Sequence, residues 1–342
     1  MDDFSRYQRQ LSLPGITPAH QKKLKATHLV MVGAGGLGAP ALPYLAAAGI
    51  GKITIIDHDT VDTTNLHRQT IYKDAQSGQS KAALAAAYLK ELNPDITVEF
   101  VTHKLENKDF PACDIILDGS DNFKTKTLLN EISIETTTPL ISASVNQFEG
   151  QIGVFSGGHR GAPCYHCLFH QLPDNARNCN EAGILGTSAG ITGLYQAHMT
   201  LIYLLGIGNL GLGSVLTLDL MTMRMRLLKL PKDASCPVCS NMKHQPLPKE
   251  NVMTEIKLVA RSELANQDHI IVDVREDYEL EADPIDNVLH IPLGQLPMRT
   301  NELPQDKVLA FVCASNIRSR KAAEYFAALG YDKVCVLDKR TA

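Results

Sequence analysis

The chain has 342 residues, which is long for one typical domain and short for three, so two domains with a core each are expected. Hydrophobic residues make up 44% and charged residues 20%, and the formal net charge at pH 7 is −4. This composition is typical of a globular protein and disfavours a disordered chain, a collagen-like chain and a nucleic-acid-binding platform. Residues 1–4 lack the start of a secretory signal, and the most apolar stretch, 201–213, is short and glycine-rich, so we expect a cytoplasmic protein without a membrane segment.

The first two thirds of the chain alternate between patterns typical of strands and of helices. A strand predicted at 25–32 ends in an apolar run and precedes a glycine-rich loop at 33–38, and an alanine-rich helix then ends at residue 48. Further strands are predicted at 53–56, 97–101, 114–117, 139–144 and 151–155, and further helices at 81–92 and 184–205. This alternation predicts an α/β fold with a doubly wound, mostly parallel sheet and helices on both faces.

A proline-rich segment at 231–250 interrupts this pattern, and we place the linker between two domains there. The predicted domains are 1–245 and 252–342. In the second domain, strands are expected at 270–274, 308–312 and 334–337, and a helix at 319–329. These short elements predict a small α/β domain.

The loop at 33–38 fits the pattern G-x-G-x-x-G with Gly33, Gly35 and Gly38, and it stands between a strand and a helix. Glycines let the backbone approach phosphate groups, and the helix N-terminus offers free N–H groups and the positive end of its dipole. Asp57 ends the next strand, where an acidic residue can bind a ribose hydroxyl. The loop alone therefore indicates a dinucleotide, and the plain alternative is a tight turn that binds nothing.

Polar residues after the second and fourth strands suit a triphosphate better than a dinucleotide. Asp59, Asn65, Arg68 and Lys81 follow the second strand, and Asp121 belongs to a polar segment after the fourth. Breaking the bond between the α- and β-phosphates needs positive groups where charge develops, and an acid such as Asp121 can hold Mg²⁺ or the attacking group. The alternative for each cation taken alone is a solvated surface residue.

Several motifs together carry a resemblance to a known family. They are Arg6-Tyr7-Gln8-Arg9-Gln10, Gly33-Ala34-Gly35-Gly36-Leu37-Gly38, Asn65-Leu66-His67-Arg68-Gln69, Lys81 and Asp121-Asn122-Phe123. In this order they resemble the ThiF/MoeB/HesA family of ubiquitin-activating-type adenylyltransferases over about residues 4–240.

The resemblance implies a homodimer in which Arg9 reaches the nucleotide site of the partner subunit. It also implies the residues that hold ATP, namely Gly36, Asp57, Asn65, Arg68, Lys81, Asp121 and Asn122. One departure is Lys126, where relatives often carry Arg. A phosphate-facing role at that position would lose bidentate geometry and keep its charge.

Four of the eight cysteines form two C-x-x-C pairs, Cys164 with Cys167 and Cys236 with Cys239. Two such pairs are typical of a closed tetrahedral Zn²⁺ site, which would join the end of the first domain to the segment after residue 155. The alternative, two redox-active pairs, is disfavoured because no helix start is predicted after either pair. The family resemblance agrees with zinc.

A further cysteine, Cys179, lies in a polar segment close to Arg177. An exposed cysteine near a cation can act as a nucleophile. Its position resembles the one that forms a thioester or disulfide with the carrier's C-terminus in the family. The alternative is a surface thiol without chemistry.

Cys313 follows an apolar strand and precedes a helix, so backbone N–H groups and the helix dipole can stabilise a thiolate or persulfide there, and Arg318 adds a cation. With Asp273-Val274-Arg275-Glu276 and His290-Ile291-Pro292-Leu293, this segment resembles a rhodanese-like domain over 252–342. It departs in having Asn316 where Gly is usual, and in ending at Ala342 without the Gly-Gly turn and Trp-bearing helix that such domains often have. An inert remnant is therefore the alternative to persulfide chemistry.

These observations predict ATP-dependent adenylation of the C-terminal glycine of a ubiquitin-like sulfur-carrier protein of the MoaD/ThiS kind, in molybdopterin or thiamine biosynthesis. Arg9, Arg68 and Lys81 are expected to stabilise phosphate charge, and Asp121 to position Mg²⁺. A persulfide on Cys313, formed by a donor such as a cysteine desulfurase, would then deliver sulfur. Two alternatives remain: an NAD-dependent oxidoreductase, supported by the glycine loop and Asp57 alone, and a non-catalytic scaffold that binds a ubiquitin-like partner.

Overall fold

The computed structural model describes residues 4–13, 15–106, 110–169, 183–240, 256–265 and 267–341. The chain divides into two compact units, one of Lys23–Glu250 and one of Met1–Lys22 with Asn251–Ala342. The domain limits 1–245 and 252–342 stay a prediction. Among the described residues, no helix is long and apolar enough to cross a membrane.

The larger unit is built on an eight-stranded sheet with the strand order β3-β2-β1-β4-β5-β6-β7-β8. The first five strands in this order are parallel, and β6, β7 and β8 are antiparallel additions at one edge. The strands are β1 (His28–Val32), β2 (Lys52–Ile56), β3 (Thr97–Val101), β4 (Ile115–Asp118), β5 (Leu140–Asn146), β6 (Glu149–Phe155), β7 (Ser214–Asp219) and β8 (Arg224–Lys229).

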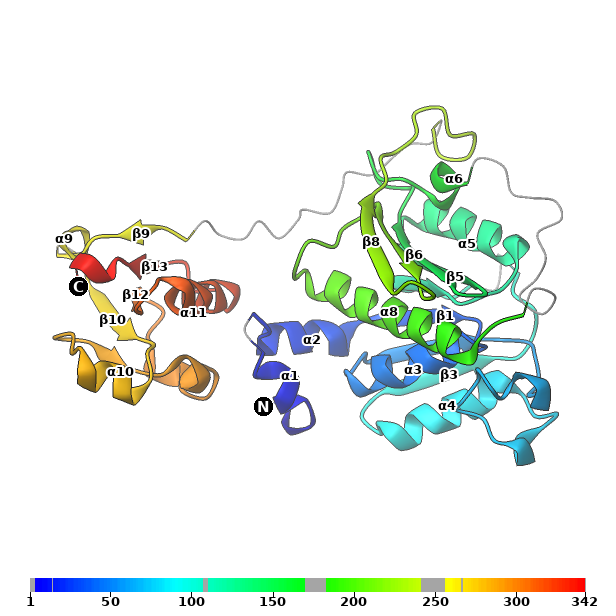
Figure 1. Ribbon diagram of the computed structural model, residues 1–342, viewed down its shortest axis with the longest axis horizontal. Coiled ribbons are helices and arrows are strands. Elements are labelled where there is room, and N and C mark those ends of the chain that lie inside the picture. The colour runs from blue at the N-terminus through cyan, green and yellow to red at the C-terminus, as the bar shows by residue number, and fades with distance from the viewer. Residues whose placement is uncertain are drawn as a thin grey trace. The chain divides into compact units, whose positions relative to one another are not determined.

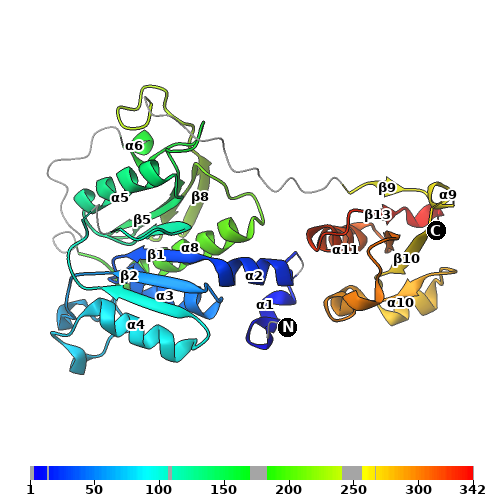
Figure 2. The same cartoon turned by 180° about the vertical axis from the view of Figure 1, so that it is seen from behind.

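Helices cover both faces of this sheet, as predicted. The helices are α3 (Gly38–Ala47), α4 (Lys81–Leu92), α5 (Phe123–Thr136), α6 (Tyr165–Leu168) and α8 (Gly186–Leu205). α3 packs against α4 and α8 on one face, and α5 packs against β4 and β5 on the other (Figures 1 and 2). Local signals set the helix ends: the Ser80 hydroxyl caps α4 by accepting a hydrogen bond from the Ala83 N–H (3.3 Å), and Gly49 at φ +88° follows α3.

Three parts of the larger unit were not predicted, namely α5, the one-turn helix α6 and the hairpin of β7 and β8. α5 was missed although Asn122 is a typical N-cap residue, and its Oδ1 accepts a hydrogen bond from the Thr125 N–H at 2.9 Å. The hairpin of β7 and β8 was also missed. All six residues of β8 are exposed, so this strand lacks the alternation that marks a half-buried strand.

The N-terminal segment contains α1 (Gln8–Leu11) and α2 (Pro18–Ala26). α2 occupies the start of the strand predicted at 25–32, and the strand itself begins at His28. The lysines of α2 explain the difference, because a strand this deep in the sheet needs the apolar run that begins only at Leu29.

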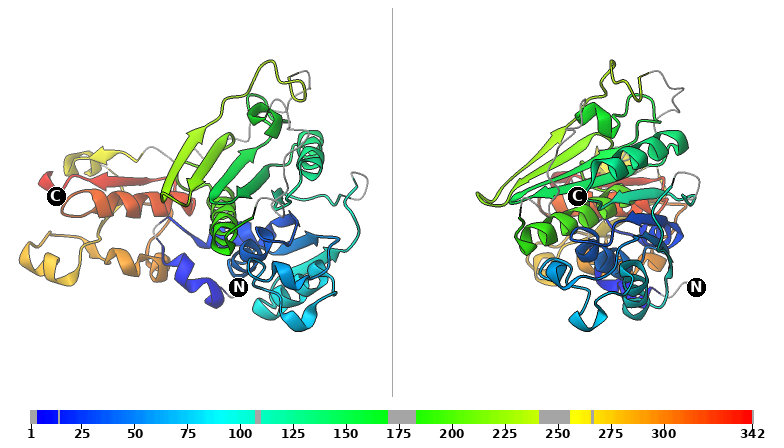
Figure 3. Two further views of the ribbon diagram at one scale, coloured as in Figure 1. Left: turned by 45° about the vertical axis from the view of Figure 1, so that its right-hand side comes forward. Right: turned by 90° about the vertical axis from the view of Figure 1, so that its right-hand side faces the viewer.

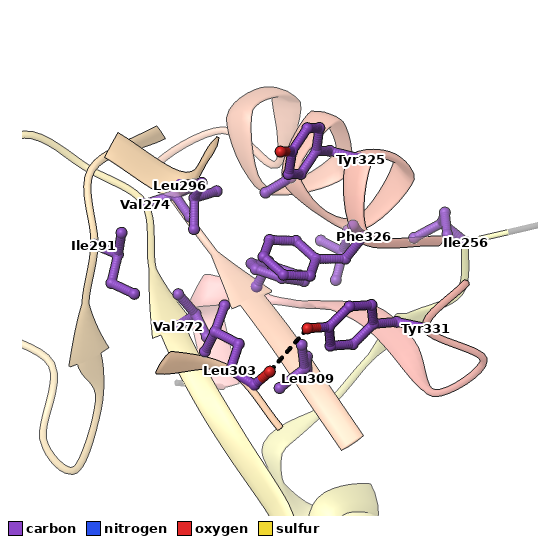
Figure 4. Close-up of a cluster of buried hydrophobic side chains, with 14 of the residues drawn as sticks. Ile256, Val272, Val274, Ile291, Leu296, Leu303, Leu309, Tyr325, Phe326 and Tyr331 are labelled. Atoms are coloured by element: carbon purple, nitrogen blue, oxygen red, sulfur yellow. Dashed lines mark hydrogen bonds between the residues drawn. The ribbon is translucent and has the colours of Figure 1, made fainter. Parts of the chain in front are cut away.

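The smaller unit has a five-stranded, fully parallel sheet in the order β11-β10-β12-β13-β9. Its elements are β9 (Leu258–Val259), α9 (Arg261–Leu264), β10 (His269–Asp273), α10 (Asp277–Ala282), β11 (Leu289–His290), β12 (Val308–Val312), α11 (Ile317–Ala328) and β13 (Val334–Leu337). Phe326 of α11 packs against Phe311 and Tyr331, with ring centroids 5.2 and 4.9 Å away. Figure 4 shows this core and the hydrogen bond that the Tyr331 hydroxyl donates to the Leu303 carbonyl (2.9 Å).

Candidate functional site

A cavity of about 1020 Å³ opens at the carboxyl ends of the parallel strands in the larger unit. The strand order reverses between β1 and β4, and crevices at such a switch point are the usual ligand sites of open α/β sheets. Every residue predicted to hold the nucleotide lines this cavity: Gly33, Gly35, Gly36, Asp57, Asp59, Asn65, Arg68, Lys81, Asp121 and Asn122. Residues from five separate segments of the chain thus meet in one place.

The glycine loop is built by close backbone contacts that only glycine permits. A Cβ on Gly38 would lie 2.0 Å from the Gly33 carbonyl oxygen, and Gly33 itself has φ +91° and faces the Gly119 backbone. Gly35 and Gly36 line the cavity, and their N–H groups donate to no acceptor among the described residues. Two free N–H groups before the first turn of α3 are able to donate hydrogen bonds to phosphate oxygens.

Asp57, at the end of β2, is held in place by the loop that it faces. Its two carboxylate oxygens accept hydrogen bonds from the N–H groups of Ala34 (2.7 Å) and Asp59 (2.8 Å). Burial raises the pKa of Asp57, and these two hydrogen bonds oppose that rise. Each oxygen keeps a second lone pair, so the carboxylate remains able to accept a ribose hydroxyl.

Lys81 begins α4 and its ammonium lies 3.1 Å from an Asp59 carboxylate oxygen. The Lys81 side chain is 5% exposed, whereas that of Asp59 is 56% exposed. The pair therefore presents a buried cation with an acidic neighbour at the cavity wall. Asp121 is exposed, and among the described residues only the Asn122 side-chain amide approaches its carboxylate, at 3.5 Å. The Asp121 carboxylate thus has fewer hydrogen-bond and ion-pair partners than the Asp59 carboxylate, and it is the better of the two to hold Mg²⁺.

Lys126 lines the cavity, but its ammonium group is hydrogen-bonded to other residues of the protein. Its ammonium donates to the buried Asp118 carboxylate (2.8 Å) and to the Ala143 carbonyl (2.7 Å). Asp118 also accepts from the hydroxyls of Ser120 and Ser142 (2.6 and 2.5 Å). A buried ion pair with these partners fixes the end of β4, so the structure gives Lys126 a structural role in place of a phosphate contact.

Two predicted residues cannot be related to this cavity. Arg9 is exposed on α1, in the other unit, and its role across a dimer interface stays a prediction. Cys179 lies outside the described residues, so its role as a nucleophile also stays a prediction.

The four predicted zinc ligands meet in one buried cluster, although the two pairs are far apart in the sequence. Sγ–Sγ distances are 3.7 Å between Cys164 and Cys236, 3.9 Å between Cys164 and Cys167, and 3.6 Å between Cys167 and Cys239. Zinc–sulfur bonds of about 2.3 Å in a tetrahedron place neighbouring sulfurs about 3.8 Å apart. The cluster is therefore compatible with zinc.

Two further features bear on this cluster. A Cβ on Gly157, two residues after the end of β6, would lie 2.5 Å from the Cys164 Cβ, so this position must be glycine for the cysteines to come together. The one-turn helix α6 starts at Tyr165, inside the first pair, where no helix start was expected. The convergence of all four sulfurs still favours a shared cation over two separate redox pairs.

In the smaller unit, Cys313 lies between β12 and α11 with its side chain fully buried. Its Sγ lies 3.3 Å from both the Ser319 hydroxyl and the Ser319 N–H. Burial acts to raise the pKa of Cys313, but hydrogen bonds from the Ser319 hydroxyl and from the N–H groups of Ser319, Ser315 and Arg318 outweigh it and lower the pKa. The loop is built to stabilise a thiolate.

The turn in this loop falls at Asn316, whose φ of 61° is in the left-handed region, as expected for an asparagine in place of glycine. Arg318, predicted to assist Cys313, donates from both terminal nitrogens to the Glu279 carboxylate, each at 2.6 Å. This ion pair with Arg318 lowers the pKa of Glu279 to about 2. Glu279 was not singled out in the sequence, because the pairing depends on α10 lying beside the loop.

The chain matches the ThiF family over residues 7–238 and the rhodanese-like domain over residues 258–339. It is 36% identical over 339 residues to the adenylyltransferase and sulfurtransferase MOCS3 of Aedes aegypti, covering 89% of this chain and 76% of that protein. It is 37% identical over 250 residues to the sulfur carrier protein adenylyltransferase of Thermus thermophilus, covering 70% of this chain and 92% of that protein.

Among solved structures, E. coli MccB with ATP superposes with a TM-score of 0.61 at 22% identity, over 69% of this chain and 75% of that one, which shows a shared fold. These matches confirm the predicted resemblance and the predicted fold class. They also confirm the prediction of an enzyme of the adenylyltransferase class with a sulfurtransferase-type domain. The chain belongs to the ThiF family and carries a rhodanese-like domain after its ThiF domain.

Proposed function

We propose that this enzyme uses ATP to adenylate the C-terminal glycine of a ubiquitin-like sulfur-carrier protein and then delivers sulfur to it from Cys313. The observation that carries the proposal is the cavity in which all the predicted nucleotide residues meet. The relatives named for adenylylation and sulfur transfer, one of them a sulfur carrier protein adenylyltransferase, support it. The pathway proposed is molybdopterin or thiamine biosynthesis, as the sequence resemblance implies.

In the first step, a carboxylate oxygen of the carrier's terminal glycine attacks the α-phosphorus of ATP, and pyrophosphate leaves with the bonding electrons. Gly35 and Gly36 donate N–H groups to phosphate oxygens, and Asp57 accepts a ribose hydroxyl. Arg68 and Lys81, joined by Arg9 of a partner subunit in a homodimer, stabilise the charge that develops on pyrophosphate. Asp121 would hold Mg²⁺, which neutralises phosphate charge when bound.

In the second step, the terminal sulfur of a persulfide on Cys313 attacks the activated carbonyl carbon, and AMP leaves. The product is an acyl disulfide between the carrier and Cys313. Attack of the Cys179 thiolate on the Cys313 sulfur would release the carrier thiocarboxylate and leave a Cys179–Cys313 disulfide, which an external dithiol reduces. A donor such as a cysteine desulfurase supplies the persulfide. We also propose Zn²⁺ in the four-cysteine cluster, as a purely structural ion.

The proposal is tested by ATP–pyrophosphate exchange with purified carrier proteins that end in Gly-Gly. Exchange is expected with one of them, and Asp121→Ala is expected to lose it. Cys313→Ala is the matched control, because it should keep exchange and lose only thiocarboxylate formation. Absence of exchange with every carrier, in folded protein with about one zinc per chain, would overturn the proposal and favour the non-catalytic scaffold.

A further inference from the structure

Tyr72 is a buried residue beside the glycine loop, and the proposed function gives it no role. It is 6% exposed and lies between two 3₁₀ helices, Thr63–Asn65 and Asp74–Gln76. Its hydroxyl lies 2.8 Å from the Ala34 carbonyl oxygen and 3.3 Å from the Lys81 carbonyl oxygen. The side chain thus connects the glycine loop with the start of α4. In Figure 3 the chain runs in colour from dark blue at the glycine loop to lighter blue at the start of α4.

The Tyr72 hydroxyl is the donor in both contacts, because a carbonyl oxygen can only accept a hydrogen bond. The shorter contact, to Ala34, is the stronger of the two. Burial raises the pKa of Tyr72, and the negative charge of Asp57 raises it further. The hydroxyl therefore keeps its proton at neutral pH and remains a donor.

The backbone of Ala34 is fixed by residues from outside the glycine loop. Its N–H donates to the Asp57 carboxylate (2.7 Å). Among the described residues, Tyr72 is the only donor to its carbonyl. Glycines place little restriction on the orientation of their peptide groups, so a glycine-rich loop depends on such contacts. The orientation of the peptide group between Ala34 and Gly35 therefore depends on Tyr72.

The hydrogen bond from Tyr72 also sets the direction of the neighbouring N–H. The Ala34–Gly35 peptide bond is trans, so the Ala34 carbonyl and the Gly35 N–H point in opposite directions in one plane. Ala34 is fully buried, whereas Gly35 lines the cavity, and its N–H has no acceptor among the described residues. A hydrogen bond to the carbonyl polarises the amide and makes its N–H a better donor. Tyr72 thus turns a strengthened donor toward the cavity.

We infer that Tyr72 is a positioning residue for the nucleotide, and that its hydroxyl holds the Ala34 carbonyl so that the Gly35 N–H points at a phosphate oxygen. This inference rests on the proposed function, because it places ATP in the cavity. Tyr72 is not among the described residues that line the cavity, so it acts through Gly35 and does not touch the nucleotide. Its contribution therefore applies to ligands that carry phosphate and not to a nucleoside.

The test compares ATP with adenosine, which lacks phosphate, as ligands of the unaltered protein and of Tyr72→Phe. This substitution keeps the ring and removes only the hydroxyl. The dissociation constant for ATP, measured by isothermal titration calorimetry, is expected to rise about ten-fold, because hydrogen bonds to charged groups are stronger than those between neutral groups. The dissociation constant for adenosine, measured by ligand-observed NMR, should stay the same.

Tyr331→Phe is the matched control. The Tyr331 hydroxyl also donates to a backbone carbonyl, that of Leu303 (2.9 Å), and Tyr331 is 8% exposed. Both variants should lose a similar amount of thermal stability, but Tyr331→Phe should bind ATP and adenosine as the unaltered protein does. An equal loss of affinity for both ligands in Tyr72→Phe, or an unchanged affinity for ATP, overturns the inference.

A second measurement needs no variant. In the proton–nitrogen correlation spectrum of the unaltered protein, ATP should shift the Gly35 amide resonance further than adenosine does, because only ATP offers this N–H a phosphate oxygen. A Gly35 resonance that responds equally to both ligands, while ATP binds, overturns this inference and leaves the proposed function standing. Absence of ATP binding by the unaltered protein overturns the proposed function itself.

Discussion

The glycine loop at 33–38 and the cysteine loop at 313–319 occupy equivalent places in two different sheets. Each follows an inner parallel strand, β1 or β12, and each leads into a helix, α3 or α11. In the first loop, the N–H groups of Gly35 and Gly36 have no partner in the described chain and face a cavity. In the second, the N–H of Ser319 points at the loop's own Cys313 sulfur.

The same local element therefore serves two kinds of anion. Glycines let the first loop bring its backbone close to an external phosphate, because no side chain stands in the way. The second loop carries its anion on a buried side chain and surrounds it with donors. The cations differ as well, since Arg226 at the cavity is unpaired in the described residues while Arg318 beside Cys313 is neutralised by Glu279.

The largest expected effect comes from Gly38→Ala. The new Cβ would meet the Gly33 carbonyl oxygen at 2.0 Å, so the backbone of the loop must move. We expect loss of ATP binding and a fall of about 1–3 kcal/mol in the free energy of unfolding, measured by ATP titration and chemical denaturation. Gly190→Ala in α8 meets no heavy atom within 4 Å and should keep both properties. Unchanged ATP affinity in Gly38→Ala would contradict the phosphate role of this loop.

A smaller effect is expected from Ser319→Ala in the cysteine loop. Removal of the hydroxyl takes away a hydrogen bond that lowers the pKa of Cys313, so the pKa rises and less thiolate exists at neutral pH. Alkylation of Cys313 by iodoacetamide, followed by mass spectrometry, should slow roughly ten-fold at pH 7, because a hydrogen bond to a charged group is worth about 1.5–3 kcal/mol.

The pH dependence of Cys313 alkylation shows the direction in which Ser319→Ala shifts the pKa of this cysteine. The rate of alkylation rises with pH through the pKa of Cys313, so the rise should move to higher pH in Ser319→Ala. Ser315→Ala is the control, since it keeps the backbone N–H that faces the sulfur. An identical pH profile in Ser319→Ala would show that the hydroxyl does not stabilise the thiolate.

The smallest effect is expected from Glu279→Gln, which releases Arg318 from its ion pair. The freed guanidinium should attract the thiosulfate dianion, so KM for thiosulfate should fall about three-fold, a size typical of partly exposed charge pairs. Sulfur transfer from a neutral persulfide donor should change less. Glu281→Gln on the same helix is the control for loss of one negative charge. A KM unchanged for thiosulfate would mean that Glu279 does not limit anion binding.

Much of the site could be predicted because its signals are local. The spacing of Gly33, Gly35 and Gly38 predicts a phosphate loop, and a cysteine between a strand and a helix predicts a stabilised thiolate. The two C-x-x-C pairs predict the four-sulfur cluster, since tetrahedral zinc requires that many ligands. The glycine loop, the cysteine loop and each C-x-x-C pair are signals within a few positions of the chain, although the two C-x-x-C pairs are 72 positions apart.

What the sequence determined by itself is which local elements form and which chemical groups they carry. The tertiary structure decided which of these groups are paired with another residue of the protein and which remain available to contact a ligand. Lys126 is paired with Asp118 and Arg318 with Glu279, whereas the Arg226 guanidinium has no hydrogen-bond or ion-pair partner within the described chain. The physical reason is that ion pairs and cavity walls depend on the register of neighbouring strands and on helices packed beside them, and these contacts join segments that no local pattern relates.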